Sequence, residues 1–309
     1  MDPLEDVLYL LEPRGHLSAR LVAGGRWGLR FDAPPGVKFN AVRRGSCLLE
    51  VEGRAEEGRV APVELAEGDC YLLTRRRPFT LRSDPEAEPV GAGPVFARAE
   101  DGLARVGRGE ETSLIGGGFT FGTRAQDLLL DRLPPVVHLP AGTRHAEAVR
   151  WSLNEIDREL TRRPAAATLV AEHLAVVMLV HVLRLHLARE PRAVSGWLAG
   201  LRDPVVATAL TALHREPARS WTVAELAGAA SVSRSTLAAR FKATVGQGPL
   251  EYLTRWRVEL AARRLREGEG TLAAIAHAVG YGSESALSVA FKRVMGMSPG
   301  DYRRRPPAR

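Results

Sequence analysis

Cysteines, basic residues at the N-terminus and long apolar runs are all scarce in this chain of 309 residues. Two cysteines without a cluster exclude a disulfide scaffold and a cysteine-rich zinc site. The opening stretch MDPLEDVLYLLEPRG has acids where a signal peptide needs bases, so we expect no export. The most apolar stretch, Leu174–Leu183, is shorter than the roughly 20 residues of a membrane span. We therefore expect a cytoplasmic protein, not bound to a membrane, in which this stretch is a buried helix.

An excess of positive charge is missing from the first 200 residues and confined to the last third. Residues 201–309 hold 17 Lys and Arg against 9 Asp and Glu, whereas the first 200 residues hold 26 against 27. This asymmetry favours a polyanion as the partner of the last third. The alternative, a solvated basic tail, accounts for Arg303, Arg304 and Arg305 but not for the bases spread through the preceding segments.

Two kinds of periodicity divide the chain. Between about residues 19 and 122, short runs rich in β-formers, such as WGLRF, VKFNAV, SCLLEVEG and CYLLT, alternate with Gly and Pro turns. This spacing predicts an all-β barrel or sandwich. Helical spacing follows at about 145–189, where the second helix, 165–189, is apolar on more faces than one neighbour covers. Pro, Gly and Ser mark a linker at 191–200, and the rest of the chain has a helical pattern.

A twelve-residue pattern occurs twice in the last third, as FKATVGQGPLEY from Phe241 and as FKRVMGMSPGDY from Phe291. In each copy a Gly suits a left-handed helix cap, and a Pro suits the first turn of the next helix. A short helix, a turn and a capping Ser precede each copy, so the repeat predicts helix-turn-helix units at about 222–244 and 271–295. The stretch between them predicts a helical rod that can place two recognition helices in successive major grooves of DNA.

The doubled unit, the linking YLTRWRVELAARRL and the ending GYGSESALSVAFKRVMGMSPGDYRR resemble the AraC/XylS family of transcription regulators. The stretches GGRWGLRF, PPGVKFNAVRRGSCLLEVEG and LAEGDCYLLTRRRPFTL resemble the cupin-type sensor domain of one branch of that family. The resemblance implies an α+β chain with a cupin-like sensor and dimerisation domain at 1–190 and an all-α DNA-binding domain at 201–309. It implies sequence-specific regulation of transcription in response to an unknown small-molecule or redox effector, with activation and repression both open.

The same resemblance gives the expected contacts with double-stranded DNA. The base-reading residues would be Arg234, Ser235, Ala238, Ala239, Glu284, Ser285, Ser288 and Val289. Relatives often carry long polar side chains at the positions of Ala239 and Val289, where small apolar groups can contact a thymine methyl but cannot grip guanine. The phosphate contacts would be Thr222, Lys242, Arg255, Arg257, Thr271, Lys292 and Arg293. Arg257 has a structural alternative, because it can pair inside its own unit.

Other partners follow from the same reasoning. RNA polymerase is one candidate partner, because the chain resembles transcription regulators. A second copy of the chain is another candidate, because a large exposed apolar face on a soluble chain usually marks an interface. The default assembly is then a two-fold dimer through the helix at 165–189. The alternative is that the barrel and the preceding helix bury every face of that helix.

An enzyme is the main competing hypothesis: a cupin-type enzyme or ligand-binding protein with a basic appendage. A nucleoid protein that binds DNA without sequence preference is the third. Metal-binding cupins place an H-x-H pair where this chain has KFNAV, and a further His where it has Phe79. The pairs His138 with His145 and His173 with His181 lack a third ligand at metal spacing. We therefore expect no metal, no cofactor and no enzymatic activity.

Cys47 and Cys70 each begin a strand after a Gly turn. If both turns lie at the same end of the barrel, the thiols lie close, and nearby arginines would lower their pKa and favour oxidation. A redox-sensing pair is therefore one hypothesis for the effector. The other is that each cysteine is a small buried hydrophobe.

Overall fold

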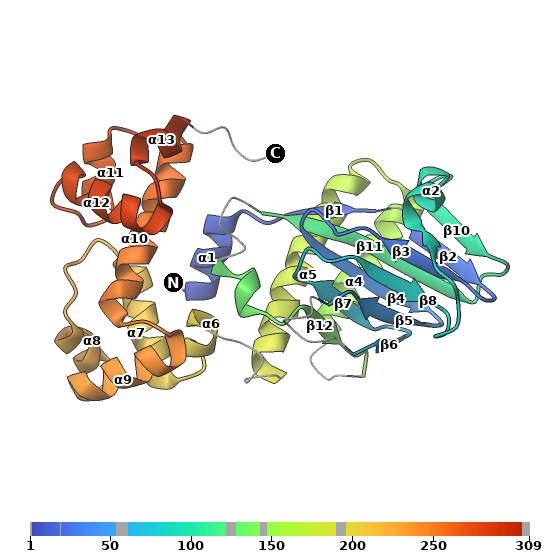
Figure 1. Cartoon of the computed structure of the whole chain (residues 1–309), viewed down its shortest axis with the longest axis horizontal. Coiled ribbons are helices and arrows are strands. Elements are labelled where there is room, and N and C mark those ends of the chain that lie inside the picture. The colour runs from blue at the N-terminus through green and yellow to red at the C-terminus, as the bar shows by residue number, and fades with distance from the viewer. Residues whose placement is uncertain are drawn as a thin grey trace. The chain divides into compact units, whose positions relative to one another are not determined.

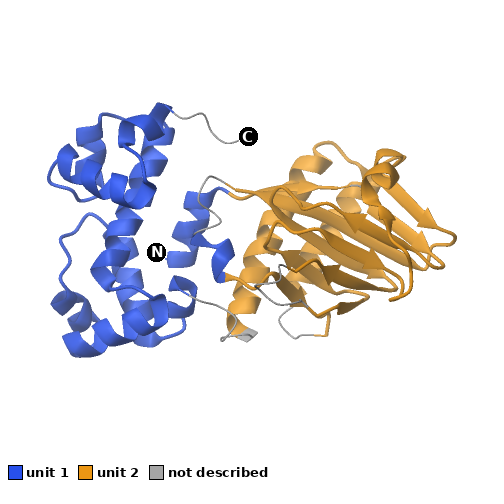
Figure 2. Cartoon of the chain, in the orientation of Figure 1, with its two compact units in different colours: residues 1–12, 122–132, 191–309 blue, residues 13–121, 133–190 orange. Residues whose placement is uncertain are grey.

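The computed structural model describes residues 2–18, 20–53, 61–121, 128–142, 147–189 and 196–304. The chain forms two compact units, coloured separately in Figure 2. The strand-rich unit comprises residues 13–121 and 133–190. The helical unit comprises residues 1–12, 122–132 and 191–309. Two segments from the predicted 1–190 domain thus belong to the helical unit, a division that the sequence pattern did not predict.

Two sheets make up the described part of the strand-rich unit (Figure 1). The first has the order β10-β2-β11-β4-β7-β12, and β1 also pairs with β11. Its strands are β1 (Arg14–Leu17), β2 (Arg20–Gly24), β4 (Val37–Arg44), β7 (Cys70–Leu73), β10 (Leu103–Gly107), β11 (Thr112–Thr120) and β12 (Val136–Leu139). The second has the order β6-β5-β8-β3-β9, with strands β3 (Gly28–Phe31), β5 (Ser46–Val51), β6 (Val63–Ala66), β8 (Phe79–Arg82) and β9 (Val90–Gly91). The strands predicted from WGLRF, VKFNAV, SCLLEVEG and CYLLT are all present, whereas β12 lies beyond the predicted end of the barrel.

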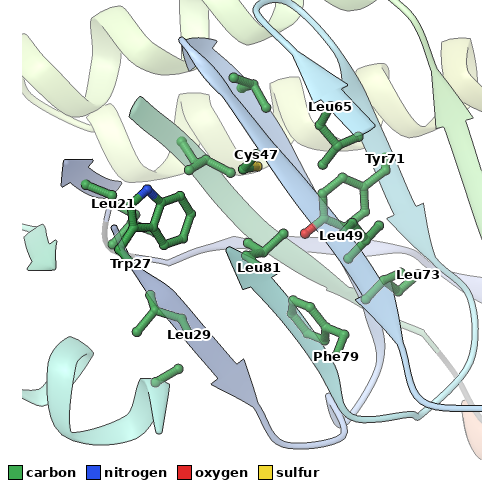
Figure 3. Packing of buried hydrophobic residues seen from close by; sticks show 14 of the residues in the cluster. Leu21, Trp27, Leu29, Cys47, Leu49, Leu65, Tyr71, Leu73, Phe79 and Leu81 are labelled. Atoms are coloured by element: carbon green, nitrogen blue, oxygen red, sulfur yellow. The ribbon is translucent and has the colours of Figure 1, made fainter. Parts of the chain in front are cut away.

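Residues from both sheets share one apolar core (Figure 3). Leu21 and Tyr71 come from the first sheet, and Leu49, Phe79 and Leu81 come from the second. Each of these side chains is at most 3% exposed. They alternate along their strands with residues that face the other way, as the two-residue period of a strand requires.

Two long helices complete the strand-rich unit: α4 (Glu147–Arg162) and α5 (Ala167–Arg189). They pack against each other, and α5 also contacts β1 and β12. By length and composition α5 could cross a membrane, and 39% of its apolar window is buried, so the helix is less buried than the sequence predicts. Leu169, Val170 and Val177 are 57%, 42% and 42% exposed, whereas Leu185 is buried.

Two helices of the helical unit come from outside the last third of the chain: α1 (Pro3–Leu11) and the short η1 (Leu130–Arg132). Its remaining helices are α6 (Trp197–Gly200), α7 (Pro204–Arg215), α8 (Val223–Ala229), α9 (Arg234–Val245), α10 (Pro249–Arg266), α11 (Leu272–Ala278), α12 (Glu284–Met295) and α13 (Pro299–Arg304). The predicted linker 191–200 is corrected at its end, because Trp197 and Leu198 are buried in α6. The Trp197 indole N–H donates to the Leu128 carbonyl at 2.7 Å, so this turn is part of the unit.

The N-terminal helix α1 packs on α7 and α10. Its buried side chains include Leu4 and Val7. Asp6 Oδ2 lies 3.2 Å from His214 Nδ1, and His214 Nε2 lies 2.7 Å from the Tyr252 hydroxyl. Burial lowers the pKa of His214, and the hydrogen bond with Asp6 opposes this shift. The buried apolar side chains of α1, together with Asp6, thereby complete the core of the helical unit.

Candidate DNA-binding surface

The first helix-turn-helix is formed by α8 and α9. The Thr222 hydroxyl accepts a bond from the Glu225 N–H at 3.2 Å, and the Glu225 carboxylate accepts one from the Thr222 N–H at 2.8 Å. The two bonds form a capping box at the start of α8. Ser233 caps α9, which starts at Arg234. These caps fix where the recognition helix begins, because they satisfy N–H groups that have no partner within the helix.

The second helix-turn-helix, α11 and α12, repeats this construction. Thr271 caps α11 by accepting a bond from Ala274 N–H at 3.2 Å, and Ser283 caps α12 in the same way. The two recognition helices end alike, at Gly246 with φ 85° and Gly296 with φ 75°. This left-handed conformation is the reason for Gly at both positions.

A matching core holds each recognition helix. Phe241 of α9 and Phe291 of α12 are fully buried. The Tyr252 ring meets Phe241 edge-on with centroids 5.9 Å apart, and the Tyr302 ring meets Phe291 edge-on at 5.3 Å. The connecting helix α10 has 18 residues, which gives a rod of about 27 Å. Figure 1 shows α9 and α12 toward opposite ends of this rod.

The expected base-reading residues lie on the outer sides of α9 and α12. Those that are exposed are Arg234, Ser235, Ala239, Glu284, Ser285 and Val289. Ala238 and Ser288 are half-buried. Val289 is 72% exposed, the highest value among the exposed large apolar side chains of the described residues. The Ser235 hydroxyl lies 2.9 Å from that of the capping Ser233, so it also belongs to the start of α9.

Most of the expected phosphate-contacting residues are exposed as well. They are Thr222, Lys242, Arg255, Thr271, Lys292 and Arg293. Arg255 lies 3.4 Å from Glu251 one turn earlier, an exposed ion pair that water screens. These side chains can therefore turn toward a polyanion at small energetic cost.

Arg257 differs from this group. Its Nε donates to the Pro217 carbonyl at 2.6 Å and its Nη2 to the Arg219 carbonyl at 2.8 Å. Burial lowers its pKa, and its guanidinium carbon lies 5.7 Å from the centroid of the Tyr281 ring. These contacts support the structural alternative for Arg257 over the phosphate contact.

The cysteines of the strand-rich unit differ from the expectation of reactive thiols. Cys47 and Cys70 are both buried and free. Burial raises the pKa of each thiol to about 12, and the charge of Asp69 adds to the shift. Desolvation of the thiolate thus outweighs the charges of arginines nearby in sequence, which favours the other hypothesis, a small buried hydrophobe at each position.

The histidines of the metal hypothesis are placed as follows. His138 lies within the first sheet, on β12, and its Nε2 is 3.0 Å from Asp69 Oδ2. His145 falls outside the described residues. His173 is exposed and His181 half-buried on α5. Within the described ranges, no three His, Cys, Asp or Glu side chains are grouped as metal ligands.

Sequence reasoning missed two groups of polar side chains. Lys38 lies in VKFNAV, which we interpreted only as a strand, and its side chain reaches a cavity of the strand-rich unit. The bonds between Asp6, His214 and Tyr252 join residues too far apart in sequence for any pattern to predict.

Comparison with known proteins defines the family. The chain matches the family model described as cupin over residues 2–188, and that described as helix-turn-helix domain over residues 226–305. A putative AraC-like transcription regulator of Streptomyces lividans is 76% identical over 306 residues, which cover 99% of each chain. The chain belongs to the family of AraC-like transcription regulators. A second AraC-like regulator, from Streptomyces antibioticus, is 75% identical over 306 residues and 99% of each chain.

The predicted architecture and function of this AraC-like regulator are thus confirmed. It combines a cupin domain with a helical DNA-binding domain, and the enzyme hypothesis is not favoured. Among solved structures, the DNA-binding domain of AdpA in complex with a target DNA is 33% identical to this AraC-like chain. That match covers 32% of this chain and 89% of the other, with a TM-score of 0.31.

Proposed function

We propose that this regulator reads its operator with α9 and α12, each inserted in a major groove of duplex DNA. The observation that carries the proposal is the repeated construction: two capped helices of 12 residues, joined by an 18-residue helix, each with an exposed row of side chains. The last third holds 17 basic and 9 acidic residues, and this positive excess supports binding to a polyanion.

The base-reading roles follow from side-chain chemistry. Arg234 can donate two bonds to a guanine, and Glu284 can accept one from a cytosine amino group. The methyl groups of Val289, which is 72% exposed, suit contact with a thymine methyl. The remaining proposed members of this row are Ser235, Ala238, Ala239, Ser285 and Ser288. Because several of them are small, DNA shape supplies part of the specificity.

The phosphate contacts position the helices without reading sequence. The proposed residues are Thr222, Lys242, Arg255, Thr271, Lys292 and Arg293. Each is exposed, and Lys242 and Lys292 occupy the same position in the two repeats, one residue after the buried Phe. Equivalent positions support equivalent roles on the two half-sites.

Footprinting of the full chain on DNA from its own promoter region, at several salt concentrations, tests the proposal. Arg234→Ala should change the preferred bases at one half-site, at a cost of about 1–3 kcal/mol in binding. Lys292→Ala should weaken all sequences alike and lower the salt dependence. If Arg234→Ala weakened binding to all DNA sequences equally, Arg234 would be a phosphate contact instead of a base-reading residue. A wild-type chain that protects no sequence in particular would contradict specific reading altogether and favour a nucleoid protein.

We further propose that the cupin domain senses a signal and performs no catalysis. Regulation of transcription at a promoter makes RNA polymerase a candidate partner and the cytoplasm the expected location. A redox signal at Cys47 and Cys70 stays a hypothesis, and their high pKa does not support it. Activation and repression both remain open.

The proposed assembly is a two-fold dimer through α5. Val170 and Val177 are exposed and seven residues apart, so they share one face of the helix. Changing both to Glu should give a folded monomer by light scattering, because two charges cannot be buried in an apolar interface. Val90→Glu, at an exposed Val of the same unit, is the matched control and should stay dimeric. A wild type that is monomeric at high concentration would exclude the interface.

A further inference from the structure

A cavity of about 540 Å³ lies within the strand-rich unit. Residues of β1, β4 and β11 line it from the first sheet, residues of β3 and β8 from the second, and residues of α2 (Ala92–Ala97) add to its wall. A volume of this size suits a small organic molecule. Since the cavity shares no residue with the DNA-binding surface, its contents are a separate question.

One end of the cavity is polar. Lys38 of β4 is half-buried there, and its Nζ donates to the Ser18 hydroxyl at 2.9 Å. His16 and Asn40 also line this end. In the ranges that the structure describes, Lys38 has no carboxylate partner within ion-pair distance. A charge held in an apolar domain without a counter-ion is unfavourable, which indicates that a ligand supplies one.

Two glycines keep this end open. On β11, Gly118 lies opposite Lys38 and beside His16 of β1, while Gly116 lies opposite Asn40. A Cβ at Gly118 would lie 2.7 Å from the His16 ring, and one at Gly116 would collide with the Asn40 amide oxygen. Gly at these two cross-strand positions therefore preserves room around the polar side chains.

The other end is apolar and aromatic. The rings of Phe31 and Phe79 stack with centroids 4.5 Å apart, and Phe96 of α2 lies 5.8 Å from Phe31. Leu21 and Leu81, labelled in Figure 3, belong both to the core cluster and to the cavity wall. The cavity thus pairs one lysine at its polar end with a mainly apolar wall, to which the exposed Asp32 adds one carboxylate.

The type of cation restricts the ligand further. The chain has three lysines, Lys38, Lys242 and Lys292, and its other basic side chains are arginines. None of the described residues that line the cavity is an arginine. One ammonium group balances the single charge of a carboxylate, whereas a phosphate monoester, with a charge of about −1.5 to −2 at pH 7, would keep unbalanced charge in this half-buried place.

The protonation states agree with this assignment. Burial lowers the pKa of Lys38 to about 8, so the ammonium form dominates at neutral pH. Burial first, and then the charge of Lys38, lowers the pKa of His16, while the charge of Glu172 opposes the shift. Lys38 is consequently the group that carries the positive charge at the polar end.

We propose that this cavity binds a small organic acid, with its carboxylate against Lys38 and its apolar body among Phe31, Phe79 and Phe96. This inference rests on the proposed sensing role of the cupin domain and names the class of its effector. The occupied cavity gives Lys38 a counter-ion that the described residues do not provide.

Calorimetry on the full chain at pH 7 tests the class with matched probes: octanoate against 1-octanol, and 3-phenylpropanoate against 3-phenylpropanol. At least one carboxylate should bind at least tenfold more tightly than its alcohol. Lys38→Met should abolish that preference, and Lys292→Met, at an exposed lysine of the other unit, should retain it. Equal binding of acid and alcohol, an unchanged preference in Lys38→Met, or no binding of either acid would overturn the proposal.

A second measurement needs no variant at the site, so a folding defect cannot confuse it. Reductive methylation followed by mass spectrometry reports separately on the three lysines. A saturating carboxylate should slow methylation of Lys38 at least fivefold and leave the exposed Lys242 and Lys292 unchanged. An unaffected rate at Lys38 would contradict contact with the carboxylate.

The outcomes distinguish this inference from the proposed function. If the chain protects a specific operator but neither acid binds at Lys38, the regulator stands and the effector class is wrong. If an acid protects Lys38 but no specific operator is found, the DNA-reading proposal fails while the organic-acid site stands.

Discussion

Lys38 shows how one side chain can be unfavourable for folding and useful for binding. Its ammonium group is partly removed from water, and among the described residues it donates to the neutral Ser18 hydroxyl and to no carboxylate. Such a group stabilises the protein only when an anion joins it. Nearby ionisable groups that line this cavity or act on its polar end are His16, Asp32 and Glu172, and none of them forms an ion pair with Lys38 in the described structure.

The first prediction is that Lys38→Met stabilises the unliganded protein at pH 7. The pKa of Lys38 is lowered from 10.5 to about 8 on folding, so below pH 8 the folded state holds a charge that the unfolded state holds more easily. As the pH rises from 8 toward 10.5, the folded state loses this proton first and the wild type regains stability. Urea unfolding should therefore show a higher free energy of unfolding for Lys38→Met than for the wild type at pH 7, and a smaller difference between the two at pH 9.5.

Lys292→Met is the control for this prediction. Lys292 is exposed, so the difference in free energy of unfolding between Lys292→Met and the wild type should not depend on pH in this range. If Lys38→Met and the wild type were equally stable at pH 7, or if their difference grew at pH 9.5, the Lys38 ammonium group would be well solvated in the folded protein.

At the scale of single helices, the ends of α9 and α12 depend on backbone conformation more than on contacts. Gly246 has φ 85°, and a Cβ built on it meets no atom within 4 Å. Substitution there tests conformation alone, since no neighbour has to move. Gly228, inside α8, also has open space around it but lacks the positive φ, which makes it a matched control.

The second prediction is that Gly246→Val lowers the free energy of unfolding by at least about 1–2 kcal/mol, the cost of a left-handed conformation in a residue with a Cβ. Gly228→Ala should instead raise it by about 0.5–1 kcal/mol, because Ala loses less backbone entropy in a helix. Thermal or urea unfolding measures both. If the two variants changed stability in the same direction, the left-handed cap would not be the reason for Gly246.

The same helices show what a sequence can predict. Thr222, Ser233 and Gly246 act within four residues of themselves, so their pattern could predict a helix-turn-helix unit at about 222–244. The burial of Cys47 and Cys70 involves distant strands, so the neighbouring arginines could not decide between a reactive thiol and a small buried hydrophobe. The affiliation of α1 with the helical unit is likewise a tertiary property, since its amphipathic pattern fits any apolar partner.

On the scale of the whole molecule, the chain passes between its units at more places than a single linker. Residues 1–12 and 122–132 belong to the helical unit, although both are joined directly to the strand-rich unit. A DNA-binding fragment cut at residue 201 would therefore lack α1 and η1, and with them the partner of His214. Experiments on the DNA-binding half should keep the full chain or supply these segments.

The last prediction concerns α1 itself. Val7 is 1% exposed on α1, so Val7→Asp places an unpaired charge in the core and should lower stability by at least about 2 kcal/mol. Tyr9→Ala, on the exposed side of the same helix, should change stability by less than about 0.5 kcal/mol. Hydrogen exchange of the full chain locates the effect: amides of α7 and α10 should lose protection in Val7→Asp, while those of α4 and α5 should not, because α1 packs on the former pair. Loss of protection in α4 and α5 alone would show that α1 stabilises the strand-rich unit instead.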